Sequence, residues 1–117
     1  MFEPKKITLK DSEQYQWGQK GAGWFLFKSD DLTVVEEELA PGVKEINHYH
    51  ERSWQFFYII SGEATLSVDG KDVKLGKDES IQVPPLVKHQ LMNNGTIAVK
   101  FIIISKPNSY NDRVIVD

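Results

Sequence analysis

Apolar positions along the chain recur in short runs that Gly, Pro, Asn and Asp residues separate. No stretch of about ten residues or more holds apolar side chains at the 3.6-residue period of a helix, whereas β-prone runs recur from end to end. We therefore predict an all-β chain. About nine or ten short half-apolar strands bury their apolar sides only by closure or face-to-face packing, which indicates a sandwich or barrel. The strands expected outside the hairpins described next are Trp24–Lys28, Leu32–Leu39, Ile46–His50, Trp54–Ile60, Ser80–Val83, Val99–Ser105 and Arg113–Val116.

Two dipeptides mark tight turns between alternating segments. Asp69-Gly70 lies between residues 64–68 and 73–75, and Asn94-Gly95 lies between residues 90–92 and 97–99. Both dipeptides supply residues that adopt positive φ, as a type I′ turn requires. The sequence predicts a β-hairpin at each of them.

Two of the expected strands have unusual faces. In the strand from Trp54 to Ile60, Gln55, Phe57 and Ile59 share one face, but the opposite face is apolar too and needs a cover. The cover is either the N-terminal strands of residues 7–39, lying over a sheet or at a dimer interface, or a second copy of the chain. We expect a homodimer, because C2 pairing is the commonest assembly. In the run 36–38 of three glutamates we expect a solvated edge strand, with one carboxylate able to point inward.

Composition narrows the class of protein. The 117 residues are enough for one domain spanning 1–117, with 14 Lys+Arg against 17 Asp+Glu and no basic cluster, so no nucleic-acid partner is expected. The absence of Cys excludes disulfides, thiolate zinc sites and cysteine nucleophiles. The longest apolar runs, 56–60 and 101–104, are far shorter than the roughly 20 residues of a membrane span. Residues 1–6 lack the apolar segment of a secretory signal, so we expect a cytoplasmic protein without a membrane partner.

The three histidines of the chain carry the candidate chemistry. His48 and His50 lie two residues apart on an expected strand, so both imidazoles point to the same face and are close enough to share one ion. Each buried ring needs partners for two nitrogens, and two adjacent rings in a core are therefore typical of a binding site. His89 lies on a later strand and could converge with them. Imidazole suits Fe, Mn, Zn, Ni and Cu alike.

Two spaced motifs around these histidines resemble the motifs of the cupin family. The first, over residues 42–62, follows G-x5-H-x-H-x3,4-E-x6-G with Gly42, His48, His50, Gln55 and Gly62. The second, over residues 78–93, follows G-x5-P-x-G-x2-H-x3-N with Asp78, Pro84, Leu86, His89 and Asn93. The chain thus resembles the small single-domain cupins of the cupin 2 type. The resemblance implies a double-stranded β-helix, a jelly-roll-like barrel of antiparallel strands.

The resemblance also implies one divalent metal ion, with ligands at His48, His50, His89 and the position of Gln55. Gln55 departs from the family pattern, which has a glutamate there. A glutamine coordinates through its amide oxygen without bringing charge, so the site should bind metal less tightly and favour an anionic ligand. In an alternative arrangement Gln55 contacts a ligand while three histidines hold the metal with open positions. A third alternative is a set of histidines left from a lost site.

Three classes of function remain open. The first is a metal-dependent dioxygenase, or an isomerase or epimerase, acting on a small oxygenated molecule in a pocket lined by Phe57, Ile59 and Leu91. An isomerase needs a general base, and the nearby Glu51 and Glu63 are expected outside the barrel. The second is a barrel that binds or senses a small ligand, such as a sugar, without catalysis. The third is a structural dimer with a vestigial site.

Arg52 and Lys88 are expected to be surface charges near the mouth of the barrel.

Overall fold

The computed structural model describes residues 2–17 and 21–116. Within these ranges a short 3-10 turn at Leu9–Asp11 precedes a series of strands, and no helix has the length and apolar character to cross a bilayer. The strands are β1 (Glu13–Trp17), β2 (Gly21–Lys28), β3 (Thr33–Leu39), β4 (His48–His50), β5 (Trp54–Ser61), β6 (Ala64–Val68), β7 (Lys71–Leu75), β8 (Ser80–Val83), β9 (His89–Met92), β10 (Val99–Lys106) and β11 (Arg113–Ile115).

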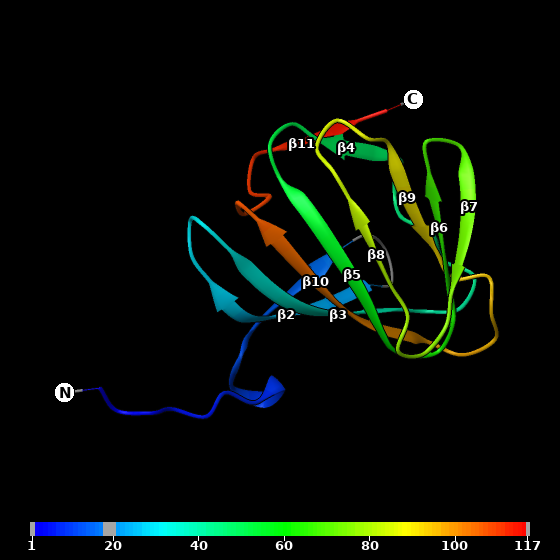
Figure 1. Ribbon diagram of the computed structural model, residues 1–117. Coiled ribbons are helices and arrows are strands. Elements are labelled where there is room, and N and C mark those ends of the chain that lie inside the picture. Colours follow the sequence, from blue (N-terminus) through cyan, green and yellow to red (C-terminus); the bar gives the residue numbers. More distant parts are fainter. Residues whose placement is uncertain (1, 18–20, 117) are drawn as a thin grey trace.

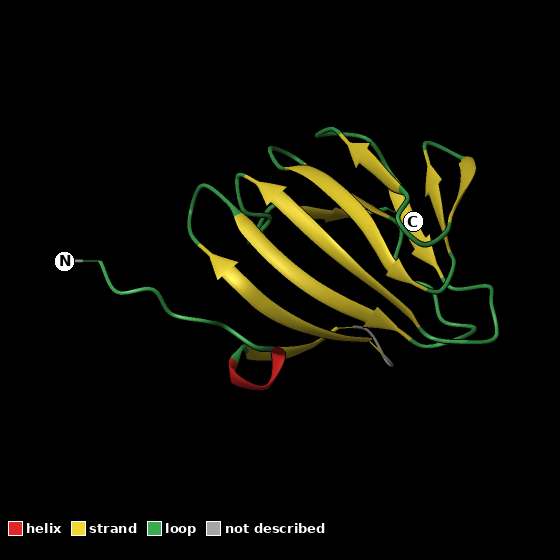
Figure 2. Cartoon of the chain, turned by 60° about the horizontal axis from the view of Figure 1, so that its bottom comes forward, coloured by secondary structure: helices red, strands yellow, loops and turns green. Residues whose placement is uncertain are grey.

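The strands form two antiparallel sheets that face each other (Figure 1). One sheet has the order β1-β2-β3-β10-β5-β8, and the other has the order β11-β4-β9-β6-β7. Figure 2 shows the long strands of the first sheet side by side, with most of the second sheet to their right and the N-terminal segment running away from the barrel. The prediction of an all-β double-stranded β-helix is confirmed.

One of the two predicted hairpins forms. Asp69 and Gly70 adopt φ values of 51° and 82°, and they join β6 to β7 with Val68 opposite Lys71. The prediction of a hairpin at Asn94-Gly95 is wrong, because β9 pairs with β4 and β6 whereas β10 pairs with β3 and β5. The loop between β9 and β10 passes from one sheet to the other. The Asn93 side chain fixes this passage: its Nδ2 donates to the carbonyls of Leu39 and Ile97, both at 2.9 Å.

The strands at the N-terminal end of the first sheet differ from the expectation. β1 is not among the strands predicted individually, and β3 is an interior strand between β2 and β10 rather than a solvated edge. Glu37 lines the barrel interior, as the alternation allowed for one of the three glutamates. β1, β2 and β3 continue the sheet that contains β5.

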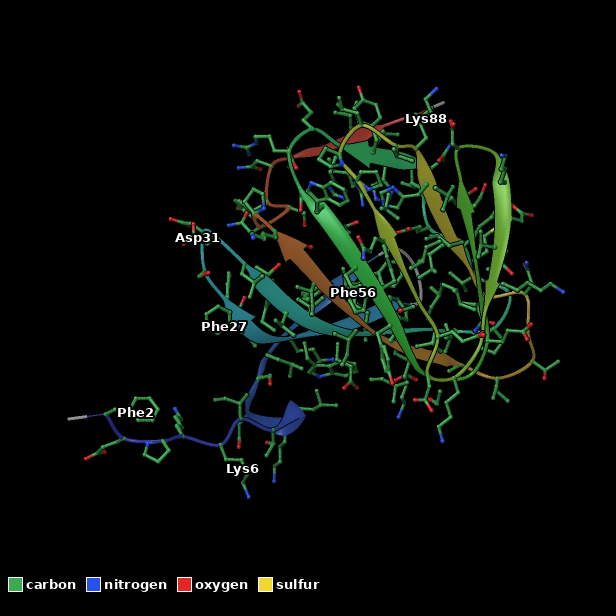
Figure 3. The ribbon with its side chains drawn as sticks, in the orientation of Figure 1. Phe2, Lys6, Phe27, Asp31, Phe56 and Lys88 are labelled. Carbon is green, nitrogen blue, oxygen red and sulfur yellow. The ribbon has the colours of Figure 1, made fainter. Side chains whose placement is uncertain are left out.

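The two faces of β5 divide as the alternation predicts. Phe57 and Ile59 are 2% and 0% exposed and belong to the core between the sheets. On the outer face Phe56, labelled in Figure 3, and Tyr58 stay partly exposed. A cover for this face, from residues 7–39 or from a second copy, stays a prediction.

Candidate metal centre

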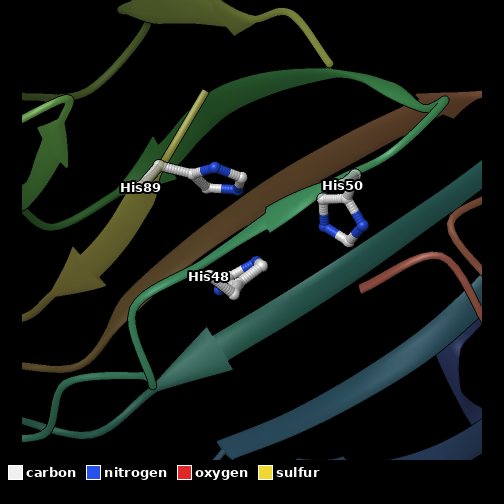
Figure 4. A group of neighbouring side chains, drawn as sticks. All are labelled: His48, His50 and His89. Carbon is white, nitrogen blue, oxygen red and sulfur yellow. The ribbon is translucent and has the colours of Figure 1, made fainter. Parts of the chain in front are cut away.

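Three imidazoles converge inside the second sheet (Figure 4). β4 lies between β11 and β9, and the pairing puts His48 directly opposite His89. His50 follows on the same face of β4, since alternate residues of a strand point the same way. All three side chains are buried, and one ligand atom of each lies within 4.8 Å of the others. The structure therefore brings together the three histidines singled out from the sequence.

Backbone carbonyls fix the orientation of two of the rings. His48 Nδ1 lies 2.7 Å from the carbonyl oxygen of Ile46, and His89 Nδ1 lies 3.0 Å from that of Val87. A carbonyl oxygen only accepts, so each Nδ1 carries the proton and each Nε2 keeps a free lone pair. Such a second partner is the usual support of a histidine that ligates a metal.

The third ring has an unsatisfied nitrogen. Among the buried side-chain nitrogen and oxygen atoms of the described residues, His50 Nδ1 is the one without a hydrogen-bond partner. A buried polar atom without a partner is costly, and such atoms mark places where an ion or water is bound. The donor set of the three rings thus fits a divalent cation.

Gln55 extends this donor set. Its Oε1 lies 3.1 Å from His89 Nε2, and its Nε2 donates to Ser105 Oγ at 3.2 Å. Since His89 Nε2 carries no proton when Nδ1 does, both atoms offer lone pairs to the same space. Metal–nitrogen distances of about 2.0–2.1 Å put neighbouring ligands roughly 3.0–3.4 Å apart, so the spacing is that of two ligands of one ion. The ligand roles of His48, His50, His89 and Gln55 nevertheless stay a prediction.

Burial keeps the histidines in the neutral form that binds metal. Burial, together with a smaller effect of the neighbouring rings, lowers the pKa of His48 to about 3 and that of His50 to about 4. Burial also lowers the pKa of His89, against a hydrogen bond from its ring to Val87. Lone pairs are therefore available at neutral pH without competition from protons.

A buried carboxylate holds β4 and β5 in place beside the histidines. Asp112 accepts hydrogen bonds from the backbone nitrogens of Arg52, at 3.1 Å, and Ser53, at 2.9 Å, and Arg52 Nε lies 3.4 Å from it. Although burial raises the pKa of Asp112, these hydrogen bonds hold it below its usual range. Arg52 therefore supports the turn between the strands while its side chain stays exposed, and Lys88 is exposed too (Figure 3), as expected for surface charges.

The histidines open onto a cavity of about 690 Å³ between the two sheets. His48, His50 and Gln55 form part of its wall, and aromatic side chains face them: Tyr15, Trp17, Phe25 and Phe57. The predicted pocket residues Ile59 and Leu91 do not line this cavity but are buried in the core cluster. The cavity has the size and the mostly apolar wall of a small-molecule site.

Two carboxylates in this cavity were not among the predicted site residues. Glu37 projects from β3, and Glu45 precedes β4 in the connection after β3. Burial raises the pKa of Glu37 to about 7 against a hydrogen bond from Tyr15. Burial likewise raises the pKa of Glu45 to about 8, against a hydrogen bond from the Leu91 backbone nitrogen. Strand alternation could have singled out Glu37, but Glu45 lies in an irregular segment that carries no such signal.

The two-sheet β-barrel with a histidine cluster in its interior is the arrangement expected from the cupin-like motifs of the sequence. The model of the cupin-domain family matches residues 35–105, which is more than half of the chain. The chain belongs to the cupin family.

Comparison with individual proteins gives distant relatives. The chain is 33% identical over 70 residues to the tetracenomycin polyketide synthase protein TcmJ of Streptomyces glaucescens, covering 60% of this chain and 47% of that protein. The chain thus spans about half the length of this relative. It is 32% identical over 56 residues to quercetin 2,3-dioxygenase of Bacillus subtilis, covering 48% of this chain and 17% of that enzyme. The polyketide cyclase RemF of Streptomyces resistomycificus shares the fold, with a TM-score of 0.84 at 17% identity over 98% of this chain and 87% of RemF.

Proposed function

We propose that this cupin is a metal-dependent enzyme acting on a small oxygenated molecule in the cavity. One divalent ion, of Fe, Mn, Zn, Ni or Cu, binds His48, His50 and His89, with Gln55 as a fourth, neutral ligand. The observation that carries the proposal is the convergence of three buried imidazoles within 4.8 Å of one another, two of which, His48 and His50, line a cavity of about 690 Å³.

The chain's own residues bind and orient the substrate. The aromatic wall opposite the histidines packs against an apolar or planar part of the molecule and excludes water, which strengthens electrostatic interactions inside. Ser105 holds Gln55 through its amide nitrogen, so the amide oxygen stays directed at His89. When bound, a divalent ion polarises a carbonyl or hydroxyl oxygen of the substrate, and with neutral ligands only it favours an anionic one.

Within this class, proton transfer as in an isomerase or epimerase fits the site best. Two carboxylates, Glu37 and Glu45, lie inside the cavity, where an isomerase needs its general base. The similarity to quercetin 2,3-dioxygenase favours a second candidate, a dioxygenase. If no reaction is found, the remaining alternatives are a barrel that binds a small ligand without catalysis and a barrel with a vestigial metal site.

We propose in addition that the protein is a cytoplasmic homodimer. The partly exposed apolar side chains on the outer face of β5 support a pairing of two copies there.

Elemental analysis of protein purified without added metal tests the proposal. We expect about one divalent ion per chain in the wild type and in Tyr49→Ala, because Tyr49 lies between the two histidines on β4 but is not a cavity residue. His48→Ala should lose the ion while the barrel stays folded by circular dichroism. Metal-free wild type, or a His48→Ala variant that keeps the full metal content, would contradict the proposal.

A further inference from the structure

Glu37 lies beside fully buried apolar side chains of the neighbouring strands. In the first sheet it pairs with Phe101 on β10, which in turn pairs with Ile59 on β5. Phe101 and Ile59 are both fully buried. A carboxylate in such surroundings is expensive to desolvate, so its presence points to a chemical role.

Tyr15 holds Glu37 from two strands away. Tyr15 on β1 lies opposite Gly23 on β2, and Gly23 lies opposite Glu37 on β3. The Tyr15 hydroxyl donates to Glu37 Oε2 across a gap of two strand spacings, roughly 10 Å. This reach depends on Gly23, because a Cβ atom there would overlap the Tyr15 ring. The Phe25 ring, 4.9 Å from that of Tyr15, packs against it.

The second oxygen of Glu37 is available to a ligand. No described residue hydrogen-bonds to Oε1, and Oε1 is not among the buried unpaired atoms, so it borders the cavity. Glu37 thus offers one oxygen to Tyr15 and the other to the cavity that His48 and His50 also line.

We propose that Glu37, held by Tyr15, is the general base of this cavity and removes a proton from a carbon next to the carbonyl group of the substrate. This inference rests on the proposed function, because the metal centre lies in the wall of the same cavity. It assigns the substrate to the carbon acids: small carbonyl compounds with a hydrogen on the adjacent carbon.

The step balances within the chain and the substrate. The Glu37 carboxylate forms an O–H bond as the C–H bond breaks, and the electron pair of that bond makes the carbon–carbon double bond of an enolate. When the carbon that loses its proton carries a hydroxyl group, the carbonyl oxygen takes up the displaced π electrons and the enolate is an enediolate. The protonated Glu37 then delivers its proton to the former carbonyl carbon while the hydroxyl proton moves to the other oxygen, which isomerises the substrate. Tyr15, through its hydrogen bond, favours the ionised form of Glu37 that accepts a proton.

Other charged groups of the cavity surround Glu37 and enter its pH dependence. The titratable groups in the wall are Tyr15 on β1, Lys28 on β2, Asp30 in the loop after it, Glu45 before β4, His48 and His50 on β4, Tyr110 in the loop before β11, and Arg113 on β11.

Deuterium exchange into two simple carbon acids, pyruvate and dihydroxyacetone, tests the proposal. Zinc-loaded protein in D2O is expected to accelerate loss of the proton signal next to the carbonyl of at least one of them, followed by NMR. Glu37→Gln should slow this exchange about 100-fold or more, because the amide cannot accept the proton. Glu38→Gln, on the same strand but outside the cavity, is the matched control and should exchange at the wild-type rate.

The pH dependence of the exchange rate tests whether Tyr15 favours the ionised form of Glu37 or only supports the fold. Tyr15→Phe and Gly23→Ala both remove the hydrogen bond that favours the ionised carboxylate, so the rise of exchange with pH should move to higher pH in both. An unshifted profile in both variants would contradict the role of Tyr15.

Zinc content, measured on the same samples, separates this inference from the proposed function. A wild type that retains no zinc overturns the metal site and the inference that rests on it. A wild type that retains zinc but exchanges neither probe, or a Glu37→Gln variant as fast as the wild type, overturns the general base and leaves the metal site standing.

Discussion

The inward-facing side chains of β3, β5 and β10 change character along the length of these strands. At one end Leu39, Ile59 and Val99 are fully buried and apolar. At the other end the same strands present Thr33, Gln55 and Ser105, next to the histidines and the cavity. The first sheet therefore supports a close-packed interior at one end and a polar, open interior at the other.

The packed end of these strands contributes to the stability of the barrel, and the polar end contributes to the candidate site. The packed end stabilises the barrel through apolar burial, which is the dominant favourable contribution to folding. The polar end holds buried groups that oppose folding unless they are paired or bound. Substitutions at the two ends should therefore have effects of opposite sign.

The largest expected effect lies at the packed end. Phe101→Ala removes a fully buried ring and should lower the free energy of unfolding by about 3–5 kcal/mol. Phe27→Ala, at a position that is 52% exposed on β2, is the control and should change it by about 0.5 kcal/mol or less. Urea unfolding measures both free energies, and equal losses in the two variants would contradict the role of the packed end in stability.

At the polar end, Glu45→Gln should stabilise the protein at high pH. Burial raises the pKa of Glu45 from 4.5 to about 8, so its stabilising contribution is complete below pH 4.5 and is lost as the pH rises through 8. Glutamine stays neutral and avoids this loss, which is roughly a few kcal/mol at pH 9.

Thermal or urea unfolding at pH 4 and pH 9 measures this effect. Glu63→Gln, at an exposed position, is the control and should leave the pH dependence unchanged. If Glu45→Gln is no more stable relative to the wild type at pH 9 than at pH 4, Glu45 is not buried in the folded protein.

Metal removal should affect only proteins with an intact histidine cluster. With metal at about a hundred times its dissociation constant, binding to the folded state adds about 2.7 kcal/mol to the free energy of unfolding. Chelation should remove this increment from the wild type and nothing from His48→Ala. If chelation destabilised both proteins equally, metal binding would lie elsewhere.

The smallest expected effect is a gain in metal affinity. Gln55→Glu supplies a charged oxygen beside His89 and should tighten metal binding about tenfold, or about 1.4 kcal/mol. Gln82→Glu, an exposed residue of β8, adds the same charge outside the cavity and is the control. Competition with a chromophoric chelator measures both, and equal affinities in the two variants would place Gln55 outside the ligand set.

The fold was predictable because the local signals agree with one another. Alternation on β5, the Asp69-Gly70 turn and the spacing of His48 and His50 all depend on short segments whose geometry the backbone period fixes. The hairpin at Asn94-Gly95 was wrong because the same dipeptide fits a loop between sheets when the flanking strands find other partners.

The contact between Glu37 and Tyr15 and the position of Glu45 in the cavity were not predictable from local pattern. Glu37 and Tyr15 meet across β2, and only the order of three strands shows that they touch. Glu45 lies in an irregular segment whose course depends on its hydrogen bond to the Leu91 backbone. Long-range contacts of this kind follow from sheet topology, which a single sequence does not determine.

X-ray absorption spectroscopy of the metal-loaded protein tests the central claim most directly, because it counts the imidazole ligands of the bound ion. We expect three imidazoles at about 2.0–2.1 Å in the wild type and two, or no bound metal, in His48→Ala. A wild-type ion surrounded by oxygen ligands alone, or an imidazole count unchanged in His48→Ala, would contradict a metal centre built from His48, His50 and His89.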